Sequence, residues 1–321
     1  MRFYRIPGSV AILLAFLSSP AQAADCGPLK LLNKIQLVSV DDRDLTVIPV
    51  SINGADKFML FDTGGAATQI TSFTVKELNL PFGTSQTGSM VDVNGNVSSH
   101  KVLVRDFKMG RLAGQDLDFP VDPDPNFGNS RLAGLIARDL LFGYDVDVDF
   151  GTKVLNLFSQ DHCRGRVVYW NDPGVGVLPI TIEEGHIHAD VVLNGKTFDA
   201  VIDTGAEDSI ISEPVALDRF GKSLDLMNDR PTLPINGKQG LIGRIHTFSS
   251  LAFGNVAVTN PRLVVLPDAM GDNKVRTHLP KMIIGMNILK HLHLYLAPKE
   301  ERLYVSAASA AAPAAGAPSG P

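Results

Sequence analysis

The chain of 321 residues contains the tripeptide Asp-Thr-Gly at two places. Asp62-Thr63-Gly64 follows the apolar run 58–61, and Asp203-Thr204-Gly205 follows the apolar run 200–202. Two carboxylic acids held close together cannot both ionise easily, so they share a proton and titrate as a pair. The ionised acid can take a proton from water while the protonated acid donates one to a carbonyl oxygen. If the fold brings the two aspartates together, the chain can hydrolyse a bond next to a carbonyl group with water as the nucleophile.

Each tripeptide stands at the same place in an internal repeat. An Asn-Gly pair lies nine residues before each aspartate, at Asn53-Gly54 and at Asn194-Gly195. Asn-Gly between two strand-like runs predicts a tight hairpin, because both central residues of that turn need positive φ. We therefore expect each aspartate to follow the second strand of a hairpin.

The correspondence continues downstream of both aspartates. Thr68 and Ser209 each lie six residues after their aspartate, and we expect a short helix after each, over 73–80 behind Ser72 and over 213–220 behind Ser212. The later matches are Asn94-Gly95 with Asn236-Gly237, Met109-Gly110 with Phe253-Gly254, and Leu135-Ile136-Ala137 with Ile283-Ile284-Gly285. Many short strands with turn signals and no long helical period predict a mainly β fold of two homologous lobes with few short helices.

A pseudo-two-fold axis between the lobes would make the two aspartate loops meet, with Asp62 beside Asp203. On that geometry the threonine hydroxyls hydrogen-bond across the interface and hold the loops. The glycines let backbone N–H groups approach the carboxylates without a Cβ in the way. The predicted catalytic residues are therefore Asp62 and Asp203, and the supporting residues are Thr63, Gly64, Thr204 and Gly205.

From Val47 to Val305 the sequence resembles the retropepsin-like aspartic proteases, in a single-chain, two-lobed, bacterial form. The second half is the closer match: the stretch Ile202 to Asp208 reads IDTGAED, and Ile283-Ile284-Gly285 follows later. The resemblance implies an aspartic endopeptidase that binds peptide or protein substrates in a cleft under hairpin flaps, with no metal or organic cofactor. It also implies substrate contacts from the flap tips and from the acids after the second loop, at Asn94, Gly95, Asn236, Gly237, Glu207 and Asp208.

The first half departs from the family pattern at two positions. Gly65 stands where alanine or serine is usual, and Ala137 stands where the later motif has glycine. These departures support an alternative, a catalytically weak or inactive peptide-binding or regulatory module on the same fold. Against it, a binding module has no need of two adjacent acids, which are unfavourable to bury.

The residues three positions after the two aspartates bear on the pH dependence of activity. They are Gly65 and Ala206, and neither carries a hydroxyl that could donate to its aspartate. Such a hydrogen bond would lower the pKa of the ionised carboxyl group. We therefore expect raised pKa values in the pair and an activity optimum at mildly acidic pH.

Two other patterns could carry chemistry. His186-Ile187-His188 and His291-Leu292-His293 each place two imidazoles on one face of a strand, as a metal site requires. A metal-dependent hydrolase is therefore a third possibility, although exposed strand histidines explain both pairs more simply. Aspartates alternate with valines over 145–149, which predicts a half-buried strand with a solvated acidic face.

The composition and the N-terminal residues limit the binding partners and the cellular location that the protein can have. The net charge is −5 without a basic block, which argues against a nucleic-acid partner. A charged start, the eight-residue apolar run 10–17 and Ala21-Gln22-Ala23 predict a signal peptide over 1–23. We therefore expect an exported protein, periplasmic or secreted, with no stable membrane insertion after cleavage. An oxidising compartment would let Cys26 pair with Cys163, the alternative being two separate thiols.

The domain organisation follows from the repeat. We expect an N-terminal lobe over 24–165, a C-terminal lobe over 166–305 and a disordered tail rich in alanine and proline over 306–321. Because both aspartates lie in one chain, we expect a monomer.

Overall fold

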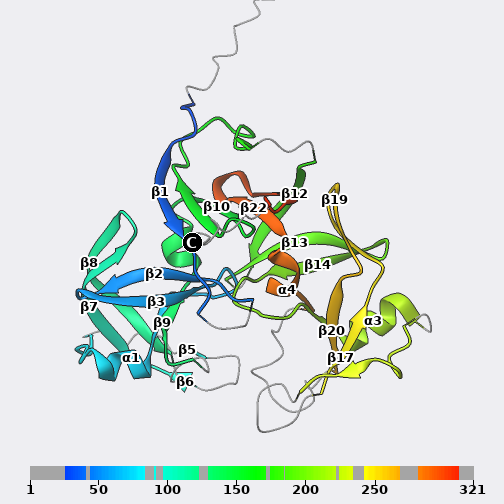
Figure 1. Ribbon diagram of the computed structural model, residues 1–321, viewed down its shortest axis with the longest axis horizontal. Coiled ribbons are helices and arrows are strands. Elements are labelled where there is room, and N and C mark those ends of the chain that lie inside the picture. The colour runs from blue at the N-terminus through cyan, green and yellow to red at the C-terminus, as the bar shows by residue number, and fades with distance from the viewer. Residues whose placement is uncertain are drawn as a thin grey trace, which may run out of the picture.

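The computed structural model describes residues 26–40, 44–83, 90–91, 97–122, 129–170, 174–183, 185–221, 224–233, 242–267 and 281–310. Over these ranges the two halves of the chain form two lobes that lie side by side, joined by a sheet to which both contribute (Figure 1). The predicted mainly β, two-lobed class with few short helices is confirmed.

The first lobe is a closed barrel. Its strands, in order of pairing, are β2 (Val47–Ile52), β3 (Ala55–Phe61), β9 (Leu132–Ile136), β4 (Gln69–Thr71), β8 (Leu112–Asp122) and β7 (Lys101–Met109). The remaining elements of this half are α1 (Ser72–Glu77), α2 (Arg138–Leu141) and the small sheet of β5 (Met90–Val91) and β6 (Val97–Ser98). Helix α1 is shorter than the predicted 73–80, and it begins at Ser72 because the hydroxyl of Thr71 accepts from Thr74 N–H and caps it.

The second lobe repeats this plan as an open sheet. The strands along it are β13 (His186–Leu193), β14 (Lys196–Ile202), β21 (Met282–Ile284), β15 (Ile210–Ser212), β20 (Arg262–Leu266), β17 (Arg244–Thr247) and β16 (Arg230–Pro231), and β18 (Ser250–Phe253) and β19 (Val256–Thr259) branch from β13. Helix α3 (Glu213–Phe220) has the predicted bounds and follows β15, and α4 (Met286–Leu289) follows β21.

The two Asn-Gly pairs form the predicted hairpin turns. Asn53 and Gly54 have φ of 51° and 83° between β2 and β3, and Asn194 and Gly195 have φ of 46° and 77° between β13 and β14. Each asparagine also binds the neighbouring strand, because its Oδ1 accepts two backbone N–H groups at 2.8–3.0 Å. The asparagine therefore supplies the turn conformation and anchors the hairpin at the same time.

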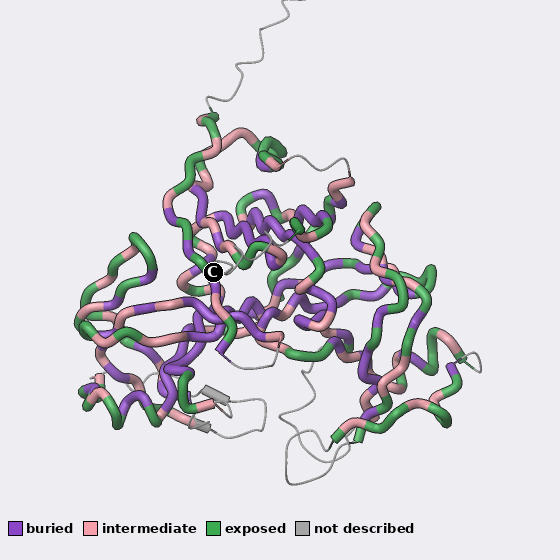
Figure 2. The backbone as a smooth tube through the Cα atoms, in the orientation of Figure 1, coloured by how far each residue is buried: buried purple, intermediate pink, exposed green. Residues whose placement is uncertain are grey.

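A sheet of strands from both halves joins the lobes. Its order is β1 (Leu31–Gln36), β11 (Val154–Phe158), β10 (Asp145–Asp149), β22 (Leu292–Ala297), β23 (Arg302–Ala307) and β12 (Gly176–Glu183), with the 3₁₀ helix η3 (Pro298–Glu300) between β22 and β23. The central pair, β10 with β22, is buried along its whole length (Figure 2). The lobes are therefore coupled through a shared core.

The expectation of a solvated acidic face over 145–149 is wrong. Asp145 is 1% exposed and accepts from His162 and from the Tyr295 hydroxyl at 3.0 Å. Asp147 is fully buried and lies 2.6 Å from His293 Nε2, which is itself buried rather than exposed. Strand β22 and the segment after β11 cover this face with hydrogen-bonding partners, which a local alternation of residue types cannot reveal.

The predicted start of the disordered tail at Ser306 is also wrong. Strand β23 continues through Ala307, and the Ser306 hydroxyl is buried and accepts from Trp170 Nε1 at 2.9 Å. Ser309 N–H donates to Asp149 Oδ1 at 3.1 Å, so the chain stays attached beyond the strand. Residues 311–321 lie outside the described residues, as does the predicted signal peptide. Within the described ranges, no helix has the length and apolarity needed to cross a membrane.

Candidate active site

Each aspartate directly follows a hairpin strand that lies beside a parallel apolar strand. In the first lobe β3 runs parallel to β9, and Asp62 N–H donates to Ile136 O at 3.0 Å. In the second lobe β14 runs parallel to β21, and Asp203 N–H donates to Ile284 O at 3.0 Å. The later apolar segment of each repeat is thus the strand that fixes the start of the aspartate loop.

The two loops hold their carboxylates in the same way. Asp62 Oδ1 accepts from Gly64 N–H at 2.9 Å and from Gly65 N–H at 2.8 Å. Asp203 Oδ1 accepts from the N–H groups two and three residues after it, at 2.8 and 3.2 Å. These hydrogen bonds orient one oxygen of each carboxylate inward and leave the other oxygen, Oδ2, for a partner.

The structure brings Asp62 and Asp203 into contact, as their pairing requires. A methyl group on Gly64 would overlap the Asp203 carboxylate, and one on Gly205 would lie 2.5 Å from Asp62 Cγ. Glycine is therefore required in both loops by the close approach of the opposite aspartate.

The two threonines form a reciprocal set of hydrogen bonds between the lobes. The Thr63 hydroxyl donates to Ile202 O at 2.8 Å and accepts from Thr204 N–H at 3.1 Å. The Thr204 hydroxyl donates to Phe61 O at 2.7 Å and accepts from Thr63 N–H at 3.0 Å. Both side chains are buried, so these bonds are made without competition from water. They fix the relative position of the two loops.

The two aspartates differ in their readiness to ionise. Burial, followed by the negative charge of Asp203, raises the pKa of Asp62 well above its ordinary value. Burial also raises the pKa of Asp203, but hydrogen bonds to its ionised form and the positive charge of His186 oppose the rise. The pair therefore shares one proton, and the surroundings of Asp203 favour the ionised form more than those of Asp62 do.

A further pair of hydrogen-bonded residues supports each loop and was missed by the sequence patterns. The Thr68 hydroxyl donates to Asp139 Oδ1 at 2.6 Å and accepts from Ala137 N–H at 3.0 Å. The Ser209 hydroxyl donates to Asn287 Oδ1 at 2.7 Å and likewise accepts the N–H of Gly285. One sequence signal points to this pair: Asp139 lies two residues after Ala137, and Asn287 lies two residues after the equivalent Gly285.

The two departures from the family pattern compensate for each other. A methyl group on Gly65 would lie 3.1 Å from the Ala137 methyl and 3.0 Å from Asp62 Oδ2. In the second lobe Ala206 carries the methyl group, and a Cβ on Gly285 would lie 2.8 Å from Ala206 O. Gly65 therefore leaves room for the Ala137 methyl group in the first lobe, and Gly285 leaves room for the carbonyl groups of Ala206 and Asp208 in the second.

The predicted substrate-contact residues are only partly described. Asp208 lines a cavity of about 130 Å³ with Arg262 and Asn287, and burial raises its pKa against the effect of the Arg262 charge. The backbone carbonyl of Glu207 accepts from Asn287 N–H at 2.9 Å. The flap residues Asn94, Gly95, Asn236 and Gly237 lie outside the described residues.

The histidine pairs do not assemble into a metal site within the described ranges. His188 Nδ1 lies 2.9 Å from Asp199 Oδ2 on the neighbouring strand, and His293 is taken up by Asp147. No group of three or more histidine, cysteine, aspartate or glutamate side chains in the described part of the chain is arranged to hold a metal ion. His186 instead lies near Asp203, on whose ionisation its charge acts.

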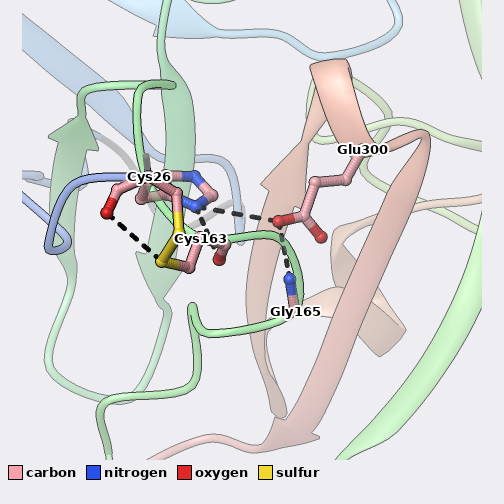
Figure 3. Close-up of a disulfide and its surroundings, with 5 residues drawn as sticks. Cys26, Cys163, Gly165 and Glu300 are labelled. Atoms are coloured by element: carbon pink, nitrogen blue, oxygen red, sulfur yellow. Dashed lines mark hydrogen bonds and ion pairs between the residues drawn. A yellow bond between two sulfur atoms is a disulfide. The ribbon is translucent and has the colours of Figure 1, made fainter. Parts of the chain in front are cut away.

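Cys26 and Cys163 form a disulfide with their Cα atoms 4.8 Å apart (Figure 3). The bond ties the start of the described chain to the segment between the lobes. Nearby, Glu300 Oε1 accepts from Gly165 N–H at 2.9 Å, so the same segment is also held by the second lobe. The disulfide lies on the joining sheet and contributes no atom to the aspartate pair.

Comparisons with known proteins agree with this geometry. Residues 48–146 match the family model described as aspartyl protease, and residues 189–291 match that of the gag-polyprotein aspartyl proteases. A search of curated proteins finds no match. The crystal structure of basic 7S globulin from soybean superposes on 88% of this chain and 96% of its own, with a TM-score of 0.50 and 10% sequence identity, which shows the fold alone.

Each matched range contains one Asp-Thr-Gly loop. Together the two ranges span well over half of the chain. The pairing of the loops across the lobes is the arrangement that the internal repeat predicted. The chain therefore belongs to the retropepsin-like aspartic proteases.

Proposed function

We propose that this protein is an endopeptidase that hydrolyses peptide bonds with a water activated between Asp62 and Asp203. The observation that carries the proposal is the close contact between the carboxyl groups of Asp62 and Asp203, both of which have raised pKa values. Such a pair supplies a base and an acid on one side of a substrate carbonyl group.

The chemistry assigns one role to each aspartate. Ionised Asp203 takes a proton from the water, and the water oxygen forms a bond with the carbonyl carbon. Protonated Asp62 gives its proton to the carbonyl oxygen. When the resulting tetrahedral species collapses, the carbon–nitrogen bond breaks and the amine leaves with the proton that Asp203 had accepted. One hydroxyl of the tetrahedral species returns its proton to Asp62 as the carbon–oxygen double bond re-forms, which restores both aspartates. The protein forms no covalent bond with the substrate.

The other parts of the proposal concern the substrate and the setting. The peptide would bind in extended form under the hairpins around Gly95 and Gly237, which lie outside the described residues. The raised pKa values of both aspartates, mainly from burial, support an optimum at mildly acidic pH. The disulfide supports export to an oxidising compartment, periplasmic or secreted, and one chain supplies both aspartates, which supports a monomer.

The alternative of an inactive binding module loses its main support in the structure. Its basis was the pair of departures at Gly65 and Ala137, and these fit each other at the loop contact. The backbone hydrogen bonds to Asp62 are as short as those to Asp203. Nothing in the first loop weakens the position of its aspartate.

The test is cleavage of a mixed peptide library by the mature chain between pH 3 and pH 8, followed by mass spectrometry. Wild-type protein should cut internal bonds, and Asp62→Asn and Asp203→Asn should each reduce the rate at least about 1000-fold. Asp56→Asn, the same change at an exposed position of β3, is the matched control and should leave the rate unchanged.

Three results would contradict the proposal. Near-normal turnover in either active-site variant would show that the aspartates do not act as a pair. Peptide binding without cleavage by the wild-type protein would favour the binding module. Loss of cleavage with a chelator, together with an unaffected Asp203→Asn variant, would instead favour a metal-dependent hydrolase.

A further inference from the structure

The two aspartates have different neighbours at one equivalent position of the repeat. In the antiparallel pairing of β13 with β14, His188 lies opposite Val201. Extending this pairing by two residues places His186 opposite Asp203. The register of β2 and β3, carried on in the same way, sets Leu45 opposite Asp62. Leu45 is buried. One aspartate therefore has an apolar neighbour where the other has an imidazole.

His186 is not paired with an acid of its own. Four other histidines are each bound by an aspartate: His162 by Asp145, His188 by Asp199, His246 by Asp229 and His293 by Asp147. No such ion pair involves His186 among the described residues, and its Nδ1 is buried without a hydrogen-bond partner. Buried polar atoms without partners are rare in proteins.

The charged groups around His186 come from three other elements. Asp203 follows β14, Glu183 stands opposite His186 on β12 and is exposed, and Arg138 begins α2 of the first lobe. Arg138 Nε would lie 3.5 Å from a Cβ on Gly185, so the turn before His186 reaches the other lobe. Of these groups, Asp203 is the one whose pKa the charge of His186 lowers.

We propose that His186 is a positioning residue for the aspartate pair, whose positive charge holds Asp203 in the ionised form and leaves the shared proton on Asp62. Its effect on the reaction rate rests on the proposed function. Its effect on which aspartate holds the proton is a property of the folded chain and can be measured without catalysis.

The electrostatic surroundings of the two aspartates agree with this asymmetry. The charge of His186 is among the causes that lower the pKa of Asp203, whereas the causes acting on Asp62 include no positive side chain. A positive charge on His186 favours the ionised form of Asp203, which the pair needs as its base, so removal of that charge should narrow the pH range of activity on its acidic side.

The test compares His186→Gln with the matched change His188→Gln, two residues further along β13. On the acidic limb of the pH profile, kcat/KM of His186→Gln should fall about threefold to tenfold, while the rate near the optimum is retained. His188→Gln should keep the wild-type profile, because His188 pairs with Asp199. His186→Lys, which restores a positive charge, should restore the acidic limb.

A second readout does not need activity. Carbon-13 NMR of the aspartate carboxyl groups should show Asp203 titrating at higher pH in His186→Gln than in wild-type protein, and unchanged in His188→Gln. If wild-type protein cleaves nothing, the proposed function fails, and this titration still decides the role of His186. His186→Leu, with the residue found at the equivalent position of the first lobe, replaces His186→Gln should the latter not fold. A folded variant with an unchanged Asp203 titration would overturn the inference.

Discussion

The first lobe places a methyl group on Ala137 and none on Gly65, whereas the second lobe places one on Ala206 and none on Gly285. The two tripeptides are identical, and the threonine and glycine of each contact the opposite loop. The methyl groups differ, and each lies within its own lobe. The tripeptide contacts across the interface must suit both loops at once, which accounts for their symmetry, whereas the methyl positions within each lobe are free to diverge.

The two lobes also differ in the polarity of the residues around their aspartates. The extended strand registers place Leu45 opposite Asp62 and His186 opposite Asp203, and the loop is supported by Asp139 in one lobe and by Asn287 in the other. Two aspartates thereby gain different surroundings, which is the basis for proposing different roles for them in the reaction.

The largest expected effect on the free energy of unfolding comes from adding a methyl group at Gly285, the position equivalent to Ala137 of the first lobe. Gly285→Ala should lower the free energy of unfolding by about 3 kcal/mol, because the new Cβ would lie 2.5 Å from Asp208 O and 2.8 Å from Ala206 O. The reverse change, Ala137→Gly, should lower it by only about 1 kcal/mol. Urea unfolding of both variants checks the difference, and equal effects would contradict the account.

The threonine pair should respond symmetrically. Thr63→Val and Thr204→Val each leave one buried carbonyl group and one buried N–H group without a partner, and each should lower the free energy of unfolding by about 2 kcal/mol. Serine at either position keeps the hydroxyl and is the control. Unfolding curves in which one valine variant is far more destabilised than the other would show that the interface is not reciprocal.

The methyl exchange at the loop contact predicts a coupling. Gly65→Ala alone should lower the free energy of unfolding by about 1 kcal/mol through its contact with the Ala137 methyl group. In the Ala137→Gly background the same change should have a smaller effect. A double-mutant cycle measures this coupling, and additive effects of the two changes would sink the explanation.

The smallest predicted effect follows from the raised pKa of Asp62: the Asp62→Asn variant should be more stable than wild-type protein, by an amount that depends on pH. A carboxyl group whose pKa is raised in the folded state binds its proton more tightly there, so stability falls as the pH rises above the range in which the unfolded chain loses that proton. Asp62→Asn removes this loss. The variant should therefore melt a few degrees above wild-type protein at pH 7 and at the same temperature as wild-type protein near pH 3. A variant that melts below wild-type protein at pH 7 would argue against a raised pKa.

The sequence was sufficient for the features that depend on local chemistry. Asn53-Gly54 and Asn194-Gly195 have the positive φ that their turn needs, and this alone fixes both hairpins and the strand ends that carry the aspartates. The repeat then makes the two loops equivalent, and a pseudo-two-fold axis brings them together. The threonine hydroxyls cross the interface as that symmetry requires.

Features that depend on distant strands could not be predicted. Alternating aspartates and valines over 145–149 are typical of a strand with one solvated face, but β22, about 150 residues away, pairs with this strand and buries its acids. Ser306 was assigned to the tail because small residues follow it, yet Trp170 binds its hydroxyl. The role of His186 depends on how β13 and β14 align, which the spacing of two histidines does not show.

The most direct measurement of the central claim is a potentiometric difference titration between wild-type protein and the double variant Asp62→Asn, Asp203→Asn. The account predicts that wild-type protein retains one additional proton at pH 6, where isolated aspartates are fully ionised, and releases it only at higher pH. If both carboxyl groups instead lose their protons in the ordinary range around pH 4, the two aspartates do not share a proton and the account is contradicted.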